Sequence, residues 1–504
     1  MKKNLGGIHF SFTAVLAFGV LAASCLVGSR YSLAQPNDNA GAWPQFRGPA
    51  FNPTAENPQL PEKWSNTENV EWAINIDGRG WSSPIVVGNQ VFVTTVTTEG
   101  DSKEPQTGVN YSNEYVEELS KQGLSEEEIE RKVMERDFEL PDQVSLHYFL
   151  MCYDLQSGKE LWKQEYYQGQ PPGGRHRKNS FSSETPVTDG NKIYVYATHL
   201  GLYAYDLDGQ PAWKTELSNH PIYMEFGTGS SPVLVDGKVV IVDDNQEQST
   251  ITAYDTSTGK QVWQTERLVP EGFPANMPRS GWSTPYIWQN ELRTEIVTVG
   301  PGMAVSYDTN GKELWRLNGL TPAPSSSSFA VDEMLYLNGG RGKPFFAVRP
   351  GASGDISLES GQQSNDHVAW TRSRVGTYIP TPVAYQGALY IVQDNGIAIR
   401  VDTETGEITF KERLSEAGGA DFTASPWAYN GKVFCVSEQG DTFVFEATDE
   451  FTLIRVNHND DLIMASPAIV GDRLLIRTAH RLYCIRNQEN TTAARKSEDA
   501  KRPG

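Results

Sequence analysis

The chain has 504 residues, a net charge of −20 and a hydrophobic share of 38%. This acidic balance excludes nucleic acid as a main partner, because a protein that binds a duplex needs a basic face. The 45 glycines and 21 tyrosines are typical of many short strands joined by tight turns, and the length indicates either several domains or a repeat array.

The first residues have the pattern of an export signal. Two lysines follow the initiating methionine, residues 10–27 are largely apolar, and Ala34 ends a small-x-small cleavage site. We therefore predict a signal peptide over residues 1–34 and an exported protein, in the periplasm or another extracytoplasmic space. Two alternatives stay open, retention of the apolar run as a membrane anchor and lipidation at Cys25. Membrane association is expected only through a retained anchor.

Residues 35–69 form a lead-in segment without periodicity, which contains Trp-Pro-Gln-Phe-Arg-Gly-Pro at 43–49. A lone strand carrying a Trp is predicted at residues 70–76. The last unit of the chain, residues 466–486, has only three strands and no Trp. We predict that the strand at 70–76 completes this last sheet, because such closure removes the open sheet edge between the termini.

Between these ends the chain repeats one unit of four short strands. Each unit opens with Ser or Thr, usually followed by Pro, and from the second opening onward the openings recur every 41 to 53 residues. This is the period of a propeller blade. For residues 70–487 we predict an all-β fold, an eight-bladed β-propeller with four-stranded antiparallel blades. The openings are Ser83-Pro84, Thr185-Pro186, Ser231-Pro232, Thr284-Pro285, Ser328-Phe329, Thr381-Pro382, Ser425-Pro426 and Ser466-Pro467.

The other end of each unit repeats as well. An Asp starts a turn, a Gly closes it, and an aromatic residue follows the Gly by four positions, as in Asp255, Gly259 and Trp263. The Asp accepts backbone N–H bonds, and Gly adopts positive φ without a Cβ clash. We predict that the ring packs on the neighbouring blade, where a buried indole contributes at most about 4–6 kcal/mol. The predicted interblade aromatic residues are Trp72, Trp162, Trp213, Trp263, Trp315 and Phe410.

Two insertions and a tail depart from the repeat. Residues 98–145 interrupt the first blade, and Ser125 with Glu128 predicts a capping box that starts a short amphipathic helix. A polar insertion occupies residues 351–366 in the fifth blade. The tail, residues 488–504, is polar and aperiodic, so we predict that it is disordered.

Cleavage of the signal would leave three cysteines, Cys152, Cys435 and Cys484. An odd number excludes complete internal pairing. Cys152 occupies a position where other units have a small Ala, so we interpret the cysteines as buried packing residues. The alternative is a disulfide between Cys152 and Cys484, which lie in adjacent blades of a closed ring.

The Asp-x-x-x-Gly-x-x-x-Trp units, the eight openings and the lead-in motif together resemble the pyrroloquinoline-quinone-like (PQQ-like) propeller family over about residues 43–487. The lead-in is most similar to that of exported members of planctomycete type. The resemblance implies the propeller fold. It leaves the function open, because the family includes quinoprotein alcohol dehydrogenases as well as non-catalytic propellers such as BamB, the outer-membrane assembly lipoprotein.

The resemblance also implies quinoprotein chemistry, but this chain lacks the sequence motifs of the quinoprotein enzymes. Those enzymes carry two adjacent cysteines and often Trp-Asp pairs, and this chain has neither. PQQ and Ca²⁺ are candidate cofactors without a matching motif, and we predict no catalytic residue. No metal site is predicted either, because the eight histidines are scattered. Carboxylate pairs such as Asp243-Asp244 are interpreted as solvated turns.

Any ligand site is expected on one face of the ring. The loops between second and third strands and the connections between blades gather there around the channel. The basic cluster at 175–178 has two interpretations, an anion- or quinone-binding ring at the channel mouth and solvated loop charge. The candidate ligand residues are Arg175, His176, Lys178, Asn245, Arg279, Trp282, Arg341, Lys343, Asp394 and Glu438.

Three functional hypotheses follow. The first is a non-catalytic interaction or scaffold module, which presents its loop face and inserted helix to another cell-envelope protein. The second is a PQQ-dependent alcohol dehydrogenase with atypical ligands. The third is a propeller that binds a small ligand or a glycan.

Overall fold

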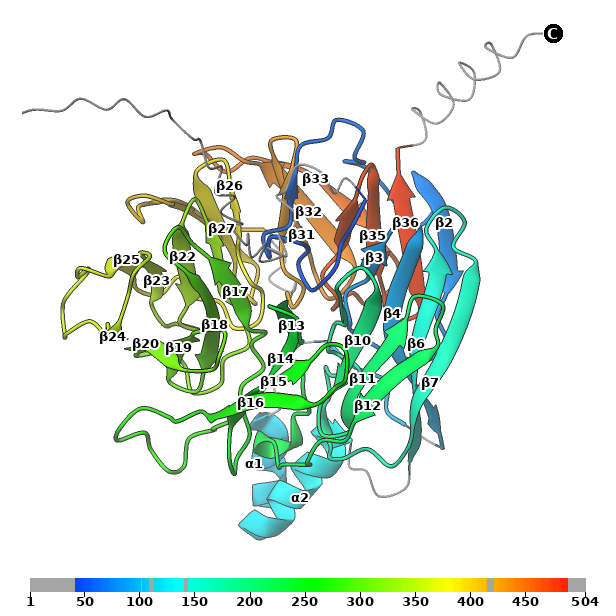
Figure 1. The fold of residues 1–504 in the computed structure, drawn as a ribbon, viewed down its shortest axis with the longest axis horizontal. Helices are drawn as coiled ribbons and strands as arrows, with labels where there is room; N and C mark the ends of the chain where they lie inside the picture. Colours follow the sequence, from blue (N-terminus) through cyan, green and yellow to red (C-terminus); the bar gives the residue numbers. More distant parts are fainter. Residues whose placement is uncertain (1–40, 101, 108–112, 140–143, 415–420, 488–504) are drawn as a thin grey trace, which may run out of the picture. The chain divides into compact units, whose positions relative to one another are not determined.

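The computed structural model describes residues 41–100, 102–107, 113–139, 144–414 and 421–487, all within one compact unit of the chain, residues 36–504. Eight sheets of four or five strands follow one another in chain order around a ring, as the colour sequence in Figure 1 shows. The predicted all-β, eight-bladed propeller is confirmed. The predicted signal peptide with Cys25 and the predicted tail lie outside the described residues.

The first four blades follow the chain from the lead-in onward. Blade 1 contains β3 (Ile85–Val87), β4 (Gln90–Glu99), β6 (Ser145–Asp154) and β7 (Glu160–Gly169). Blade 2 contains β9 (Val187–Thr188), β10 (Lys192–Ala197), β11 (Gly201–Asp206) and β12 (Pro211–Thr215). Blade 3 contains β13 (Val233–Val235), β14 (Lys238–Asp243), β15 (Thr250–Asp255) and β16 (Gln261–Glu266). Blade 4 contains β17 (Tyr286–Gln289), β18 (Thr294–Gly300), β19 (Met303–Tyr307) and β20 (Glu313–Asn318), with β24 (Gly354–Asp355) added in parallel.

The other four blades complete the ring. Blade 5 contains β21 (Phe329–Val331), β22 (Met334–Asn338), β23 (Phe345–Val348) and β25 (Val368–Arg372). Blade 6 contains β26 (Val383–Tyr385), β27 (Ala388–Val392), β28 (Ile397–Asp402) and β29 (Ile408–Arg413). Blade 7 contains β30 (Trp427–Tyr429), β31 (Lys432–Val436), β32 (Asp441–Glu446) and β33 (Leu453–His458), with β1 (Thr54–Ala55) added in parallel. Blade 8 contains β34 (Ala468–Val470), β35 (Arg473–Arg477), β36 (Arg481–Arg486) and β2 (Val70–Asn75).

The N-terminal strand closes the last blade, as predicted. β2 pairs antiparallel with β36, and the register places Trp72 opposite Cys484 and Ile74 opposite Leu482. Blade 8 therefore takes one strand from the start of the chain and three from its end. In Figure 1 the blue β2 lies beside the red β36.

The apolar core lies between the blades. In blade 3 the four central residues of β15 are all buried, whereas the outer strand β16 alternates between exposed and half-buried residues. Strands covered on both faces read as continuous apolar runs, which is why the inner strands lack polar alternation. One buried cluster continues from Val233 in blade 3 to Val401 in blade 6, so neighbouring sheets share their side chains.

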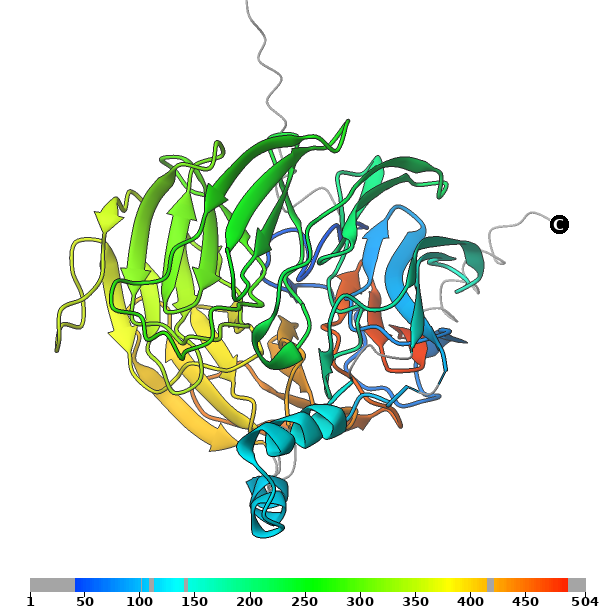
Figure 2. The same ribbon diagram turned by 90° about the horizontal axis from the view of Figure 1, so that it is seen from below.

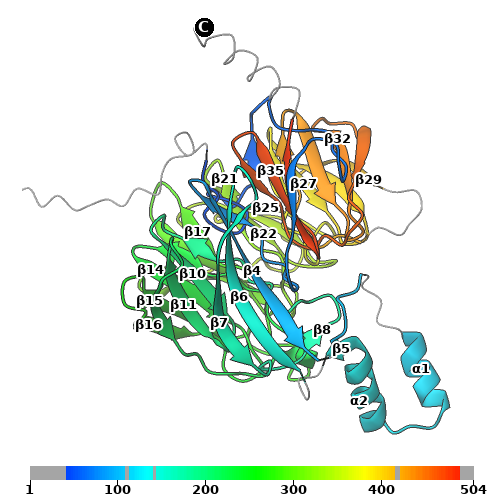
Figure 3. The same ribbon diagram turned by 90° about the vertical axis from the view of Figure 1, so that its right-hand side faces the viewer.

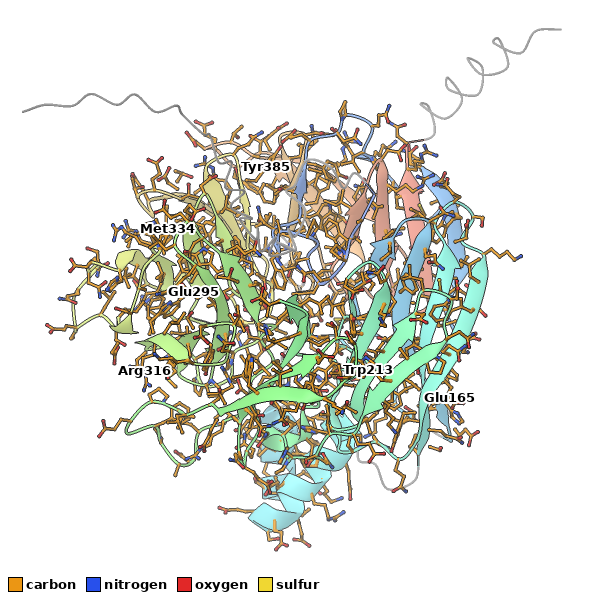
Figure 4. The ribbon with its side chains drawn as sticks, viewed as in Figure 1. Glu165, Trp213, Glu295, Arg316, Met334 and Tyr385 are labelled. Carbon is orange, nitrogen blue, oxygen red and sulfur yellow. The ribbon has the colours of Figure 1, made fainter. Side chains whose placement is uncertain are left out.

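The tryptophans after the Asp–Gly turns dock on the next blade by one repeated contact. The Trp213 indole N–H donates to the carbonyl of Thr256, 2.9 Å away, and its ring lies against Gly259, the turn glycine of blade 3. Figure 4 places Trp213 on β12. The spacing of the motif thus places the Trp ring of one blade against the turn glycine of the next blade, where no side chain is in the way. The same bond joins Trp72 to Leu155, Trp162 to Leu207, Trp263 to Thr309 and Trp370 to Thr403.

This contact predicts that a side chain at Gly259 would destabilise the protein. A Cβ there would overlap the Trp213 ring, and the residue has a φ of +68°. We expect Gly259→Ala to lower the free energy of unfolding by about 2–4 kcal/mol, combining backbone strain with overpacking. Gly272 has a similar φ of +74°, and a methyl group added to it would meet no atom within 4 Å, so Gly272→Ala isolates the strain, about 1 kcal/mol. Urea unfolding followed by tryptophan fluorescence measures both, and equal losses would contradict the docking contact.

Blade 5 departs from the rule because of its insertion. The segment between β23 and β25 replaces the Asp–Gly turn, and β24 within it pairs with β20 so that Gly354 lies opposite Trp315. The Trp315 indole donates to Glu295 of its own blade at 2.7 Å instead of to the next blade. The Gly-to-aromatic spacing did not reveal Trp370, which supplies the docking ring of blade 5. Phe410 in blade 6 contacts Phe451 of blade 7, with ring centroids 5.5 Å apart.

The Ser and Thr residues of the unit openings form a belt of hydrogen bonds around the channel. The backbone N–H of one opening residue donates to the hydroxyl oxygen of the opening residue in the next blade, as from Ser83 to Thr185 at 2.9 Å. Seven such bonds of 2.9–3.1 Å run from blade 1 to blade 8. In blade 5 the belt residue is Ser327, one position before the opening read from the sequence.

The seam between blade 8 and blade 1 is joined differently. Arg477 in blade 8 is buried, and its Nη1 donates to the carbonyl oxygen of Ser82 at 3.1 Å and to the Ser82 hydroxyl at 2.5 Å. The Ser83 hydroxyl makes no hydrogen bond within the described residues. Between blades 8 and 1, the connecting hydrogen bonds are therefore donated by an arginine side chain, whereas the other seven pairs of blades are connected through a Ser or Thr hydroxyl.

The lead-in contacts the blades at the end of the ring where first and second strands turn. Trp43 exchanges two backbone bonds with Val86 of blade 1, and Thr54 and Ala55 pair with β30 of blade 7. The buried Arg47 donates to three carbonyls, those of Phe51, Thr381 and Pro382, at 2.5–2.8 Å. In Figure 2 this dark-blue segment lies within the ring of sheets. The lead-in thus ties together blades that are not neighbours.

The predicted capping box starts α2 (Glu126–Asp137), with Ser125 and Glu128 bonded reciprocally. A second helix that was not predicted, α1 (Asn113–Lys121), precedes it. Cys152, Cys435 and Cys484 are buried and carry free thiols, so the alternative disulfide between Cys152 and Cys484 is wrong. Burial raises the pKa of the Cys152 thiol to about 12. Among the described helices none has the length and apolarity to cross a membrane.

Candidate functional site at the channel mouth

We call the end of the channel opposite the lead-in the channel mouth. An ion pair bridges it: Lys178, from the connection between blades 1 and 2, lies 2.5 Å from Glu438, from the β31–β32 loop of blade 7. Both side chains are buried, and the Thr423 hydroxyl also donates to Glu438 at 2.7 Å. Because blades 2 and 7 are not neighbours, the pair joins loops across the ring. Two of the predicted residues are thus brought together, as partners of each other.

The other members of the basic cluster fold their own loop. β8 (Arg175–His176) pairs with β5 (Phe138–Glu139), the strand that follows α2. The Arg175 guanidinium donates to the carbonyl oxygens of Asn179, at 2.7 Å, and Lys103. Burial, together with the charges of Lys178 and Arg177, lowers the pKa of His176 to about 3. His176 is therefore a neutral imidazole at physiological pH, and its Nδ1 accepts the Lys178 backbone N–H.

In the loops of blades 5 and 6 the predicted residues form a second pair. The exposed Arg341 lies 3.3 Å from the buried Asp394. Lys343 is exposed and Arg279 is half-buried, and neither forms an ion pair within the described residues. Of the predicted basic residues, Lys178 and Arg341 thus stand in ion pairs, and a binding ring at the mouth stays a prediction.

The two remaining candidates hold loops in place. The Asn245 amide oxygen accepts from the backbone N–H groups of Glu247 and Gln248, at 2.9 and 2.8 Å. The Trp282 indole donates to the carbonyl of Gly227 at 2.7 Å and lies beside Phe226. These contacts are those of an Asx turn and of a packing residue.

The interpretation of Asp243-Asp244 as a solvated turn is wrong for the second residue. Asp244 is buried and makes a two-pronged pair with Arg267, at 2.7 and 3.0 Å. Burial raises the pKa of the Asp244 carboxyl, while the Arg267 charge opposes the change. Two adjacent acids in the sequence do not indicate that one of them pairs with an arginine 23 positions away in the chain.

The described residues do not fit a quinone held by calcium. The carboxylate of Glu438 is paired with Lys178, that of Asp394 with Arg341, and the Asn245 amide serves its own loop. No group of three or more His, Cys, Asp or Glu side chains in the described ranges could hold a metal ion.

A cavity of about 230 Å³ lies beside the mouth, in the connections of blades 1 to 3, and the sequence analysis did not predict it. Its wall includes Glu184, which is buried and accepts from the hydroxyls of Thr198, at 3.0 Å, and Thr228. Burial raises the pKa of Glu184. Further wall residues are Tyr148, His199, Asn219 and His220.

The two helices project from the same face. Figure 3 shows α1 and α2 standing clear of the sheets, linked to them through β5 and β8. The described residues 115–137 carry eight acidic and four basic side chains, and most of α2 is exposed. Phe138 anchors the helices by packing on Phe226, with ring centroids 5.4 Å apart.

Comparison with known proteins places these features in context. A family model described as "Outer membrane protein assembly factor BamB" matches residues 150–412 and 302–489. Among curated proteins, the outer membrane protein assembly factor BamB of Yersinia pestis is 22% identical over 323 residues, covering 58% of this chain and 78% of that protein.

Solved structures share the propeller fold. BamB from Moraxella catarrhalis superposes with a TM-score of 0.50 at 14% identity, covering 67% of this chain and 88% of that one. Quinohemoprotein alcohol dehydrogenase from Comamonas testosteroni gives a TM-score of 0.56 at 12% identity, with 89% and 80% covered. At these identities the likeness establishes the fold alone.

Proposed function

We propose, on the premise that the chain belongs to the PQQ-like propeller family of the outer membrane protein assembly factor BamB, that it is an exported scaffold that binds another cell-envelope protein. The observation that carries the proposal is the family match, which spans the blades from residue 150 to residue 489. Two contacts at the mouth support it, because Lys178 and Arg341 are each engaged by an acid of the chain itself, Glu438 and Asp394.

The projecting helices supply a surface for that partner. Glu126, Glu127 and Glu130 are exposed on α2, within a segment that carries twice as many acidic as basic side chains. Charged surfaces of one sign steer an oppositely charged partner and set its orientation. The partner is therefore an envelope protein with a basic patch, which docks against α2.

Site-specific crosslinking in intact cells tests this function. A photo-reactive residue at Glu130 is expected to form an adduct with a second envelope protein, and cell fractionation is expected to find the chain outside the cytoplasm. Glu126→Lys combined with Glu127→Lys should reduce the adduct yield by roughly fivefold or more, because two steering charges are reversed.

The matched control reverses two charges away from the helices. Glu359 and Glu412 are exposed in blades 5 and 6, and Glu359→Lys with Glu412→Lys changes the net charge by the same amount. The control variant should keep the adduct. A cytoplasmic location, or an adduct that survives reversal on α2, would contradict the proposal.

A further inference from the structure

Glu184 departs from the repeat in a way that the fold does not require. In the seven other blades, the residue before the belt Ser or Thr is Ser, Pro or Ala. A small residue suits this position because it is buried against the neighbouring blade, as at Ser230 and Ala424. Blade 2 alone has a carboxylic acid there. The equivalent positions are Ser82, Glu184, Ser230, Ser283, Ser326, Pro380, Ala424 and Ala465.

The structure around Glu184 supplies hydrogen-bond donors to the carboxylate but no cation among the described residues. Both hydroxyl donors, from Thr198 and Thr228, reach the same oxygen, Oε1. The backbone N–H groups of Ser183 and Glu184 also interact with the carboxylate. No Lys, Arg or His of the described residues forms an ion pair with Glu184, so the carboxylate has neutral donors alone. A buried charge without a partner is costly, so most buried carboxylates have an arginine or lysine, as Asp244 has Arg267.

The missing partner has room in the cavity that Glu184 lines. A volume of about 230 Å³ accommodates a small organic molecule. The ring of Tyr148 contributes an aromatic wall, and Asn219 an amide. The one arginine at the wall, Arg175, donates to carbonyl oxygens and lies over the Phe181 ring. The two histidines at the wall, His199 and His220, each contact another acid, Asp243 and Glu247 respectively.

We propose that this cavity binds a small organic ammonium compound, a primary or methylated amine, with the cation against the Glu184 carboxylate. The carboxylate supplies the opposite charge, and the neighbouring aromatic ring favours a cation over a neutral group of the same size. The site is distinct from the protein-binding surface on α2, so the two activities are separable.

Calorimetric titration of the mature chain with choline and with ethanolamine tests the proposal. Choline is compared with its neutral isostere 3,3-dimethylbutan-1-ol, which has the same volume without the charge. We expect choline or ethanolamine to bind at least tenfold more tightly than the neutral isostere. Glu184→Gln keeps the size of the side chain and the hydroxyl contacts, and it should weaken ammonium binding tenfold or more.

The controls separate binding from folding. Glu247→Gln removes an acid that contacts His220 but does not line the cavity, and it should change the affinity less than twofold. Glu184→Gln should unfold at the same urea concentration as the parent chain or a higher one, because it removes a buried charge. Failure of both amines to bind, equal binding of the neutral isostere, or unchanged affinity in Glu184→Gln would overturn the proposal.

Discussion

Replacing Arg47 with methionine is expected to release the lead-in from the ring and to lower the free energy of unfolding by about 3–6 kcal/mol. Methionine preserves most of the volume but donates no hydrogen bond. The carbonyls of Phe51, Thr381 and Pro382 would then stay buried without their donor, at about 1–3 kcal/mol each, offset in part by removal of a buried charge. Urea unfolding measures the loss.

Limited proteolysis adds a local readout for Arg47→Met. Cleavage within residues 41–62 should become faster while the blades stay intact, because the lead-in is held by contacts separate from the sheets. Arg349→Met is the matched control, since Arg349 is exposed and its guanidinium makes one long bond of 3.3 Å to the carbonyl of Asn365. The control should change stability by less than about 0.5 kcal/mol. A lead-in as resistant as that of the parent chain would show that Arg47 does not secure it.

Lys178→Met is expected to cost about 3–5 kcal/mol, the usual effect of removing one member of a buried ion pair. The Glu438 carboxylate is fully buried, and the variant takes away the ammonium group 2.5 Å from it. Because the pair joins loops across the ring, the variant should also loosen the channel mouth. Hydrogen exchange at residues 173–180 measures that loosening independently of global unfolding.

A double-mutant cycle identifies the source of the loss. Lys178→Met with Glu438→Gln should cost less than the sum of the single changes, since no unpaired charge remains in the double variant. Lys214→Met provides the comparison, because Lys214 lies 3.7 Å from Glu216 with both side chains largely exposed, and it should cost at most about 1 kcal/mol. Additive losses at Lys178 and Glu438 would mean that the two side chains act separately.

Repetition explains why so much of the fold was predictable. The Ser/Thr openings and the Asp–Gly turns each make the same contact in many blades, so one rule, read several times, indicates both the number of sheets and their order. The placement of β2 followed from a missing strand and a missing Trp in the last unit. In the structure Trp72 makes the same bond to the next blade as Trp213 does.

Contacts that occur once could not be predicted in this way. The lead-in reaches the ring through single bonds, such as that from Arg47 to Thr381, 334 positions away in the chain, and no periodicity marks them. In blade 5 the insertion separates Gly351 from Trp370, so the four-residue spacing disappears although the docking contact remains.

The site illustrates the same limit. The sequence showed the basic residues 175–178 and separately the acids at 394 and 438, but pairing of Lys178 with Glu438 depends on how the ring brings distant loops together. Glu184, in contrast, could have been identified from the sequence. Alignment of the openings with one another shows a carboxylic acid where the other units have a small residue, and a comparison of units position by position would have found it.

The belt of hydroxyl bonds has a consequence for how propellers of this kind change size. Seven of the joints are chemically interchangeable, so duplication or loss of a whole unit would preserve them without any compensating substitution. Among the blade joints that the structure describes, the one made by Arg477 differs from the other seven. The belt by itself therefore places no limit on blade number, whereas the joint at Arg477 and the lead-in contacts across the ring are each made once.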